Sequence, residues 1–305
     1  MRARLIAVAK WAWLAVVVIG AGFVVARGWD DIVEAWATAS LPLITAALLL
    51  TMLAKLFLAE NARMAAAATG FVMRYLDAAR LYNLSQLGKY LPGSIWQFIG
   101  RAAAYRHLGA NYGQIRDALL VESLWIVAGA TVVGCVLTGR GLYPLVSEGL
   151  SSGVVIWLAA GFSTVALVVL VMLLVKRDLV RRYMRLALPP VRVLLVQAAI
   201  WALLGLSFWM LARACGVAID PFFAAGLFAV AYAIGFLVPF APAGLGVRDA
   251  ILIVGLLGFG ESAEAIVVTV LARLIYLVVD LLMVAGQELL GLVPAVAKRM
   301  SPLDR

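Results

Sequence analysis

A segment of mixed polar and turn-forming residues, residues 88–101, interrupts an otherwise apolar stretch. Pro92 lacks a backbone donor and Gly93 tolerates left-handed geometry, so one helix is predicted to end here and another to begin with Ser94 as its cap. Backbone N–H groups at such a helix start, flanked by Lys89 and Arg101, would form a cradle for a phosphate. The alternative is that both cations snorkel towards lipid headgroups.

A second segment, residues 239–249, offers another helix break beside an arginine. It contains Gly244 and Gly246, followed by Arg248 and Asp249. Unpaired backbone at membrane depth is tolerated only against protein or a water-filled cavity, so two such breaks predict a polar cavity between them. The other interpretation of Arg248 and Asp249 is a local structural ion pair.

The last long apolar stretch carries two opposite charges. Arg273 and Asp280 are seven residues apart, which places them on one helical face with Tyr276 between them. Charge this deep in an apolar helix is costly, which favours an interior face with partners. Substrate binding and a structural pair linking helices both remain open. For Lys55 and Glu122, which we place nearer to the ends of their helices, snorkelling or helix pairing is favoured.

These residues would bind an anion and do not predict catalysis. We expect Lys89, Arg101, Arg248 and Arg273 to contact phosphate, with Asp249 and Asp280 balancing the charge. The chain has a single His, no HExxH motif, no metal-ligand cluster and no nucleophile beside a base, so we predict neither catalysis nor a metal or cofactor. The full set of candidate substrate-binding residues is Lys89, Pro92, Gly93, Gln97, Arg101, Gly244, Gly246, Arg248, Asp249, Arg273, Tyr276 and Asp280.

The elements that must position them belong to a membrane protein. The chain has 305 residues, of which 65% are hydrophobic and 13% charged, whereas soluble domains carry about 25% charged residues. The net charge of +9 resides largely in short loops between apolar runs, which argues against nucleic acid as a partner. We therefore predict a single all-α, polytopic integral membrane domain over residues 1–305.

Six apolar runs are long enough to cross a bilayer, whose hydrocarbon core of ~30 Å needs about 20 helical residues. Two further stretches, 71–105 and 222–259, are broken by Pro, Gly and charge into pieces that are too short to span. The six predicted spans are residues 5–26, 41–59, 118–138, 153–175, 193–212 and 265–286.

Loop charges orient this bundle. Lys and Arg precede the first span and crowd the loops around residues 63–116, 176–192 and 298–305, so both termini are expected in the cytoplasm of a plasma-membrane protein. Parity then requires stretches 71–105 and 222–259 to enter and leave by one face each, as re-entrant hairpins from opposite faces. Residues 41–138 and 193–286 would form an inverted-topology repeat, an architecture typical of secondary transporters.

Residues 83–93, which read Asn-Leu-Ser-Gln-Leu-Gly-Lys-Tyr-Leu-Pro-Gly, and residues 242–249 resemble the lysylphosphatidylglycerol synthase transmembrane-region family. The resemblance covers nearly the whole chain. It implies a role in flipping phospholipids or lipid-borne glycans between leaflets. Many relatives have Gly-Glu where this chain has Trp96 and Gln97, and Glu is common where it has Asp249.

The expected function is therefore translocation of an anionic, phosphate-bearing lipid, such as a phospholipid or a polyprenyl-phosphate-linked glycan carrier. The family's aminoacyltransferase domain is absent from this sequence, so synthase activity is not expected. Two alternatives belong to other classes. One is an intramembrane lipid-modifying transferase or phosphatase. The other is a non-transporting scaffold for enzymes of lipid or glycan synthesis. Such enzymes are candidate partners of the protein under any of these functions.

Overall fold

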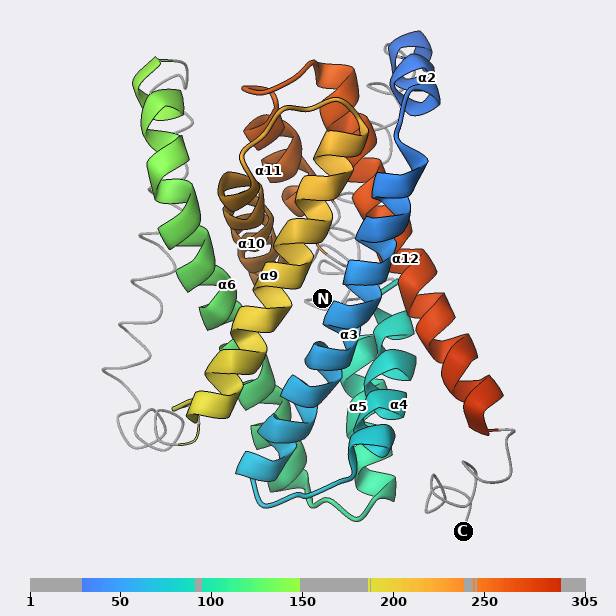
Figure 1. The fold of residues 1–305 in the computed structure, drawn as a ribbon. Coiled ribbons are helices and arrows are strands. Elements are labelled where there is room, and N and C mark those ends of the chain that lie inside the picture. Colours follow the sequence, from blue (N-terminus) through green and yellow to red (C-terminus); the bar gives the residue numbers. More distant parts are fainter. Residues whose placement is uncertain are drawn as a thin grey trace, which may run out of the picture.

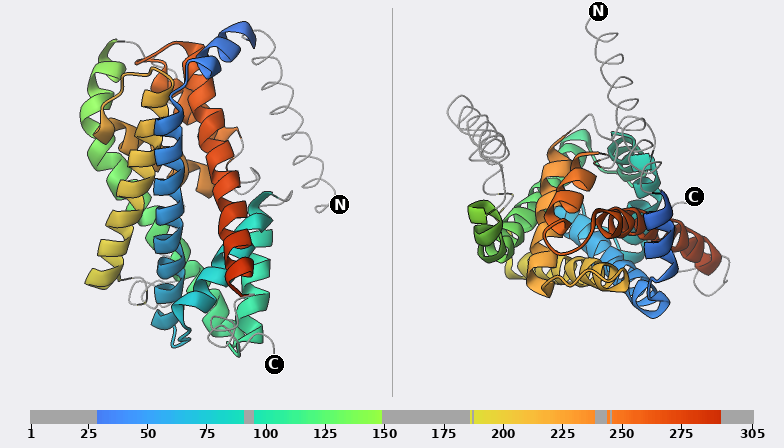
Figure 2. Two further views of the ribbon diagram at one scale, coloured as in Figure 1. Left: turned by 45° about the vertical axis from the view of Figure 1, so that its right-hand side comes forward. Right: turned by 90° about the horizontal axis from the view of Figure 1, so that it is seen from above.

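The computed structural model describes residues 29–90, 95–148, 186, 188–238, 244 and 246–291. Within these ranges the chain is helical, with short turns and no strand. The helices form an elongated bundle (Figures 1 and 2). The prediction of an all-α protein is confirmed for this part of the chain.

Four long apolar helices form the body of the bundle, and by length and composition each can cross a membrane. They contain the predicted spans 41–59, 118–138, 193–212 and 265–286, whereas the predicted spans 5–26 and 153–175 lie outside the described residues. The four helices are α3 (Leu41–Ala68), α6 (Tyr112–Glu148), α9 (Val191–Ala214) and α12 (Ser262–Gly291). They are longer than the predicted spans because polar helix formers such as Glu60 continue the helix beyond the apolar run. The short helix α2 (Trp29–Ala37) precedes α3.

Each of the two broken stretches forms a pair of shorter helices. The first contains α4 (Tyr75–Gln86), the 3₁₀-helix η1 (Leu87–Tyr90) and α5 (Trp96–His107), and the second contains α10 (Pro221–Leu237) and α11 (Val247–Leu256). We call these stretches hairpin 1 and hairpin 2. A helix of 12 residues, such as α4 or α5, is about 18 Å long and cannot cross the hydrocarbon core by itself. Ile95 precedes α5 as its N-cap, one residue after the predicted cap Ser94, which lies outside the described residues.

The two hairpins lie at opposite ends of the bundle. Hairpin 1 occupies the lower half of Figure 1 and hairpin 2 the upper half. The colours show α3 and α12 running downwards in this view and α6 and α9 running upwards. The unit α3, hairpin 1, α6 therefore runs in the opposite sense to the unit α9, hairpin 2, α12.

Helices α3 and α9 pack side by side along their whole length. The N–H of Ser40 donates to the carbonyl of Ala214 at one end, over 2.9 Å. The hydroxyls of Thr51 and Ser207 share a hydrogen bond of 2.8 Å farther along, and the Gln197 amide donates to Asn61 over 2.9 Å near the other end. The buried polar side chains of Thr51, Ser207, Asn61 and Gln197 therefore all have hydrogen-bond partners, as a low-dielectric interior requires.

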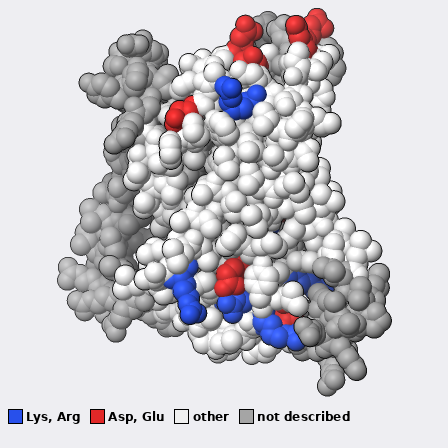
Figure 3. All heavy atoms as spheres, viewed as in Figure 1, with Lys and Arg blue, Asp and Glu red and all other residues white. Residues whose placement is uncertain are grey.

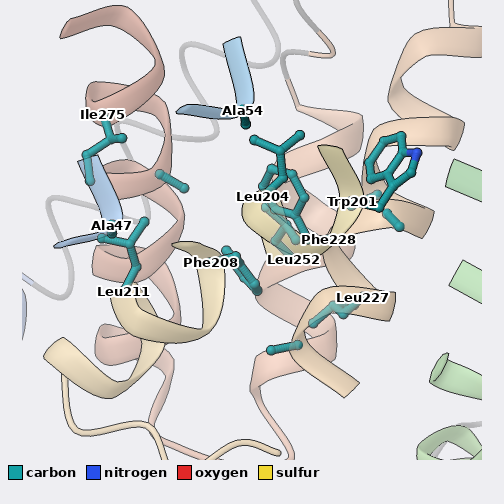
Figure 4. Close-up of a cluster of buried hydrophobic side chains, with 14 of the residues drawn as sticks. Ala47, Ala54, Trp201, Leu204, Phe208, Leu211, Leu227, Phe228, Leu252 and Ile275 are labelled. Carbon is teal, nitrogen blue, oxygen red and sulfur yellow. The ribbon is translucent and has the colours of Figure 1, made fainter. Parts of the chain in front are cut away.

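The core lies where α9 and α10 meet α3, α11 and α12. Figure 4 shows Trp201, Leu204 and Phe208 of α9 packed among buried side chains of these neighbours. Small residues allow the helix backbones to approach: a Cβ added to Gly205 would lie 2.3 Å from Cβ of Ala225 on α10. Contacts between small residues are a usual basis of helix packing in membranes.

Charged side chains gather at the two ends of the bundle on the face shown in Figure 3. The belt between them is almost free of charged atoms on this face. Large apolar side chains are exposed along the long helices, among them Leu49 and Leu53 on α3 and Val132 and Val136 on α6. An apolar belt between charged ends fits a protein that is embedded in lipid.

Candidate functional site

A cavity of about 620 Å³ lies inside the bundle and is walled by both hairpins together with α3, α6 and α12. Aromatic side chains and cations dominate its lining. Its lining includes Lys55, Tyr82, Lys89, Tyr90, Gln97, Arg101, Arg116, Glu122, Tyr232, Gly235, Gly244, Arg248, Arg273 and Tyr276. Because both units of the chain contribute, the cavity exists only when the two units are packed together.

Two lysines share one buried carboxylate at the wall of this cavity. Asp280 of α12 has no exposed surface, and its Oδ1 lies 2.5 Å from Nζ of Lys55 on α3. Its Oδ2 lies 2.5 Å from Nζ of Lys89 on η1 and accepts a hydrogen bond of 2.7 Å from the Tyr90 hydroxyl. We call Lys55, Lys89 and Asp280 the lysine pair cluster. It joins α3, hairpin 1 and α12. Its two ammonium groups and one carboxylate have a formal net charge of +1.

The ring of Tyr276, one helical turn before Asp280, faces three cations. Nζ of Lys55 lies 5.4 Å from the ring centroid, Nζ of Lys89 lies 5.5 Å from it, and Cζ of Arg248 lies 5.0 Å from it. Attraction between a cation and an aromatic face is stronger when both are desolvated. The Tyr276 hydroxyl is buried and has no hydrogen-bond partner among the described residues.

Arg248 projects from the start of α11 and lies against two aromatic rings. Its Cζ lies 4.7 Å from the ring centroid of Phe228 and 5.0 Å from that of Tyr276. Its Nε and Nη2 atoms are buried and have no acceptor within the described part of the chain. A guanidinium with buried, unpaired donors is a site for an anion that offers planar, bidentate acceptors.

The alternative interpretation of Arg248 and Asp249 as a local ion pair is wrong. Asp249 instead accepts two hydrogen bonds of 2.6 Å from Arg273 of α12, and a third of 2.9 Å from the N–H of Gly246. Consecutive residues on a helix point in different directions and do not face each other. Asp249 therefore ties α11 to α12 and leaves Arg248 to the cavity. Arg273 and Asp280 likewise pair with other helices and not with each other.

Arg101 is held by protein groups from several sides. Its guanidinium forms an ion pair with Glu122 of α6, its Nε donates to the Ser85 hydroxyl over 3.2 Å, and its Cζ lies 4.6 Å from the Tyr82 ring centroid. Only 2% of the residue is exposed. Hairpin 1 is thus joined to α6 by a buried charge pair, and the charge of Arg101 is already balanced.

Glycines allow the hairpins to fold tightly around these side chains. A Cβ on Gly88 would lie 2.7 Å from the backbone nitrogen of Gln97, so η1 and α5 meet only because residue 88 has no side chain. In hairpin 2, Gly244 and Gly246 have φ of +71° and +85°, which other residues adopt only with strain. These two turns position Arg248 at the start of α11.

The structure brings most of the predicted site residues to one place. Lys89, Gln97, Arg101, Gly244, Arg248, Arg273 and Tyr276 line the cavity, and Asp280 holds the two lysines at its wall. Gly246 and Asp249 lie at the start of α11 beside it, and Pro92 and Gly93 lie outside the described residues.

The structure adds two residues to the site for which the sequence favours snorkelling or helix pairing. Lys55 and Glu122 both line the cavity, each in an ion pair. Lys55 lies near the middle of α3 and is 1% exposed, so snorkelling is wrong for it and pairing between helices is correct. An ammonium far from either end of its helix is the signal that could identify Lys55 as a site residue. The predicted apolar run, however, ends at residue 59, which places Lys55 near the edge of the run.

No group of three or more potential metal ligands occurs among the described residues.

The apolar helices and the cationic, aromatic cavity between them define a multi-pass membrane protein with an internal polar site. The chain belongs to the family described as the lysylphosphatidylglycerol synthase TM region, whose model matches residues 11–283. The resemblance inferred from residues 83–93 and 242–249 is thereby confirmed. A search of curated proteins found no match.

Proposed function

We propose that the protein is a lipid translocase that moves an anionic, phosphate-bearing lipid between the two leaflets of the plasma membrane. The observation that carries the proposal is the cavity of about 620 Å³ between the hairpins, with Arg248 presenting buried donors that lack an acceptor among the described residues. Membership of a family named for the membrane region of a lipid synthase supports a lipid as the substrate.

The architecture we propose is six transmembrane helices and two re-entrant hairpins in one membrane domain, with both termini in the cytoplasm. The opposite directions of the units α3, hairpin 1, α6 and α9, hairpin 2, α12 support an inverted-topology repeat. Secondary transporters with such repeats bind substrate near the midplane, between the repeats and beside discontinuous helices. The cavity has this position relative to the two units.

A phosphate headgroup would be bound in the cavity while its acyl or prenyl chains stay in lipid. A phosphate that leaves water loses its hydration, and charge-assisted hydrogen bonds must replace it. Arg248 would donate two of them. Lys89 and Arg273 also line the cavity, and each already shares a carboxylate with another group. The aromatic rings would exclude water around the headgroup and strengthen these contacts.

Transport in proteoliposomes tests the proposal. Purified protein is reconstituted with a fluorescent anionic lipid, and the fraction of lipid accessible to an impermeant quencher is followed with time. We expect faster exchange between leaflets than in protein-free vesicles, and no acceleration for a lipid with an uncharged headgroup. An unchanged exchange rate would contradict translocation, and a covalently altered lipid in the mass spectrum would favour the enzyme alternative.

A further inference from the structure

The charges at the cavity do not balance. Six basic side chains line it, and the carboxylates that pair with them number four among the described residues, which leaves a formal excess of two positive charges. The cations are Lys55, Lys89, Arg101, Arg116, Arg248 and Arg273, and the carboxylates are Asp117, Glu122, Asp249 and Asp280. Residues 91–94 and 239–243 of the sequence contain no ionisable side chain.

The excess has two locations on the cavity wall. Arg101, Arg116 and Arg273 each have a carboxylate, so the unbalanced charges fall on Arg248 and on the lysine pair cluster. Both lie against the same ring, because Lys89 and Arg248 are 5.5 Å and 5.0 Å from the centroid of Tyr276. Both cations are therefore close neighbours of any headgroup that binds beside Tyr276.

Unbalanced charge in a low-dielectric site is unfavourable until an opposite charge enters. A phosphodiester lipid brings one negative charge. A phosphate monoester brings about two at neutral pH, because its second pKa is about 6, and a pyrophosphate brings at least as many. Only the second kind of headgroup can neutralise Arg248 and the lysine pair cluster at once.

We infer that the cavity selects a lipid with a doubly charged headgroup, a phosphate monoester or a pyrophosphate, over a lipid phosphodiester with a single charge. This inference rests on the proposed function and narrows its substrate class. Lys89 and Arg248 are the residues that set the preference.

Binding measurements with two lipids of identical acyl chains test the preference. Phosphatidic acid, a monoester, and phosphatidylglycerol, a diester, are titrated into the purified protein in detergent at pH 7, with thermophoresis as the readout. We expect phosphatidic acid to bind at least about tenfold more tightly, which corresponds to ~1.4 kcal/mol. Glycerol phosphate should displace it only at far higher concentration. Equal competition by glycerol phosphate would assign the site to a free phosphate compound and overturn the inference.

Lys89→Met is the decisive variant, because it leaves Lys55 and Asp280 as a balanced pair. We expect its unfolding temperature without lipid to be no lower than that of the wild type, while its preference for phosphatidic acid falls to about twofold or less. Arg248→Gln, which removes the other excess charge, should lower the preference in the same way. Arg213→Gln, an exposed position in the last turn of α9, is the matched control and should keep the wild-type preference.

The possible failures are distinguishable. Equal affinity of the wild type for both lipids, or an unchanged preference in Lys89→Met and Arg248→Gln, would overturn the inference and leave translocation of a singly charged lipid intact. Binding of neither lipid would overturn the proposed function as well.

Discussion

Arg273 on α12 donates two hydrogen bonds of 2.6 Å to the carboxylate of Asp249 on α11. The same carboxylate accepts from the N–H of Gly246, so it fixes the turn before α11 and the helix that follows. The pair is partly buried, with 27% of the Arg273 side chain and 19% of the Asp249 side chain exposed.

A double-mutant cycle measures what this pair contributes. We expect Asp249→Asn and Arg273→Gln each to lower the free energy of unfolding, and the coupling between them to be about 1.5–3 kcal/mol, the range for hydrogen bonds to charged groups. Unfolding in mixed micelles is the measurement. Additive effects of the two substitutions would contradict a direct bond between these side chains.

Arg101 should behave as a structural residue. Arg101→Met leaves Glu122 buried without its partner, and we expect a loss of about 3–5 kcal/mol in the free energy of unfolding. The double variant Arg101→Met/Glu122→Leu removes both charges and should recover most of that loss. If the double variant is as unstable as the single one, the role of Arg101 in joining hairpin 1 to α6 is wrong.

Two glycines 12 positions apart provide a matched comparison in hairpin 1. A Cβ on Gly88 would meet backbone atoms of Trp96 and Gln97 at 2.7–2.8 Å, whereas a Cβ on Gly100 would meet nothing within 4 Å. We expect Gly88→Ala to lower the free energy of unfolding by about 1–3 kcal/mol through steric strain. Gly100→Ala should raise it by about 0.5–1 kcal/mol, because alanine favours helix. Thermal unfolding of both variants under one condition checks the difference in sign.

Arg248 should matter for transport more than for stability. We expect Arg248→Ala to slow anionic-lipid exchange in proteoliposomes by about tenfold or more, since each charge-assisted contact is worth ~1.5–3 kcal/mol. Arg248→Lys should recover only part of the rate, because an ammonium keeps the charge and loses the planar fork. Wild-type rates in both variants would remove Arg248 from the binding site.

Cysteine accessibility tests the proposed membrane topology. Exposed Cys135 and buried Cys215 are first replaced by Ala, and single cysteines are then placed at four exposed positions. Val72 and Tyr112 flank hairpin 1, and Phe222 and Glu261 flank hairpin 2. An impermeant reagent should label the first two from the cytoplasmic side and the last two from the outside. Labelling of either pair from two different sides would mean that its hairpin spans the membrane.

The sequence predicted the helices and many of the site residues because both follow from local patterns. Apolar runs of span length predicted α3, α6, α9 and α12, and the Pro and Gly residues in stretches 71–105 and 222–259 predicted that each of these stretches forms shorter helices. Arg273, Tyr276 and Asp280 share a helical face by their spacing alone. These predictions needed no knowledge of distant contacts.

The partners of each charge could not be predicted, because they come from other helices. Asp280 contacts Lys55, 225 positions earlier in the chain, and Lys89. Arg101 pairs with Glu122 across a helix boundary, and Asp249 prefers Arg273 to its neighbour Arg248. These contacts between helices decide which cation keeps unpaired donors. The spacing of residues within one segment cannot predict them.

The polar bonds between α3 and α9 restrict how the bundle can move. Ser40 with Ala214, Thr51 with Ser207, and Asn61 with Gln197 connect the two helices at both ends and at the middle. Sliding or separating these helices would break all three bonds, and the two side-chain pairs are buried where lipid offers no replacement.

We therefore expect α3 and α9 to stay together as a rigid pair that joins the two units of the chain. We expect any motion that opens the cavity first to one leaflet and then to the other to be made by the hairpins, α6 and α12 around this pair, and a movement of α12 also has to release the Lys55–Asp280 ion pair. In such a motion the surrounding helices rock against the fixed α3–α9 pair, and the two units of the chain do not separate.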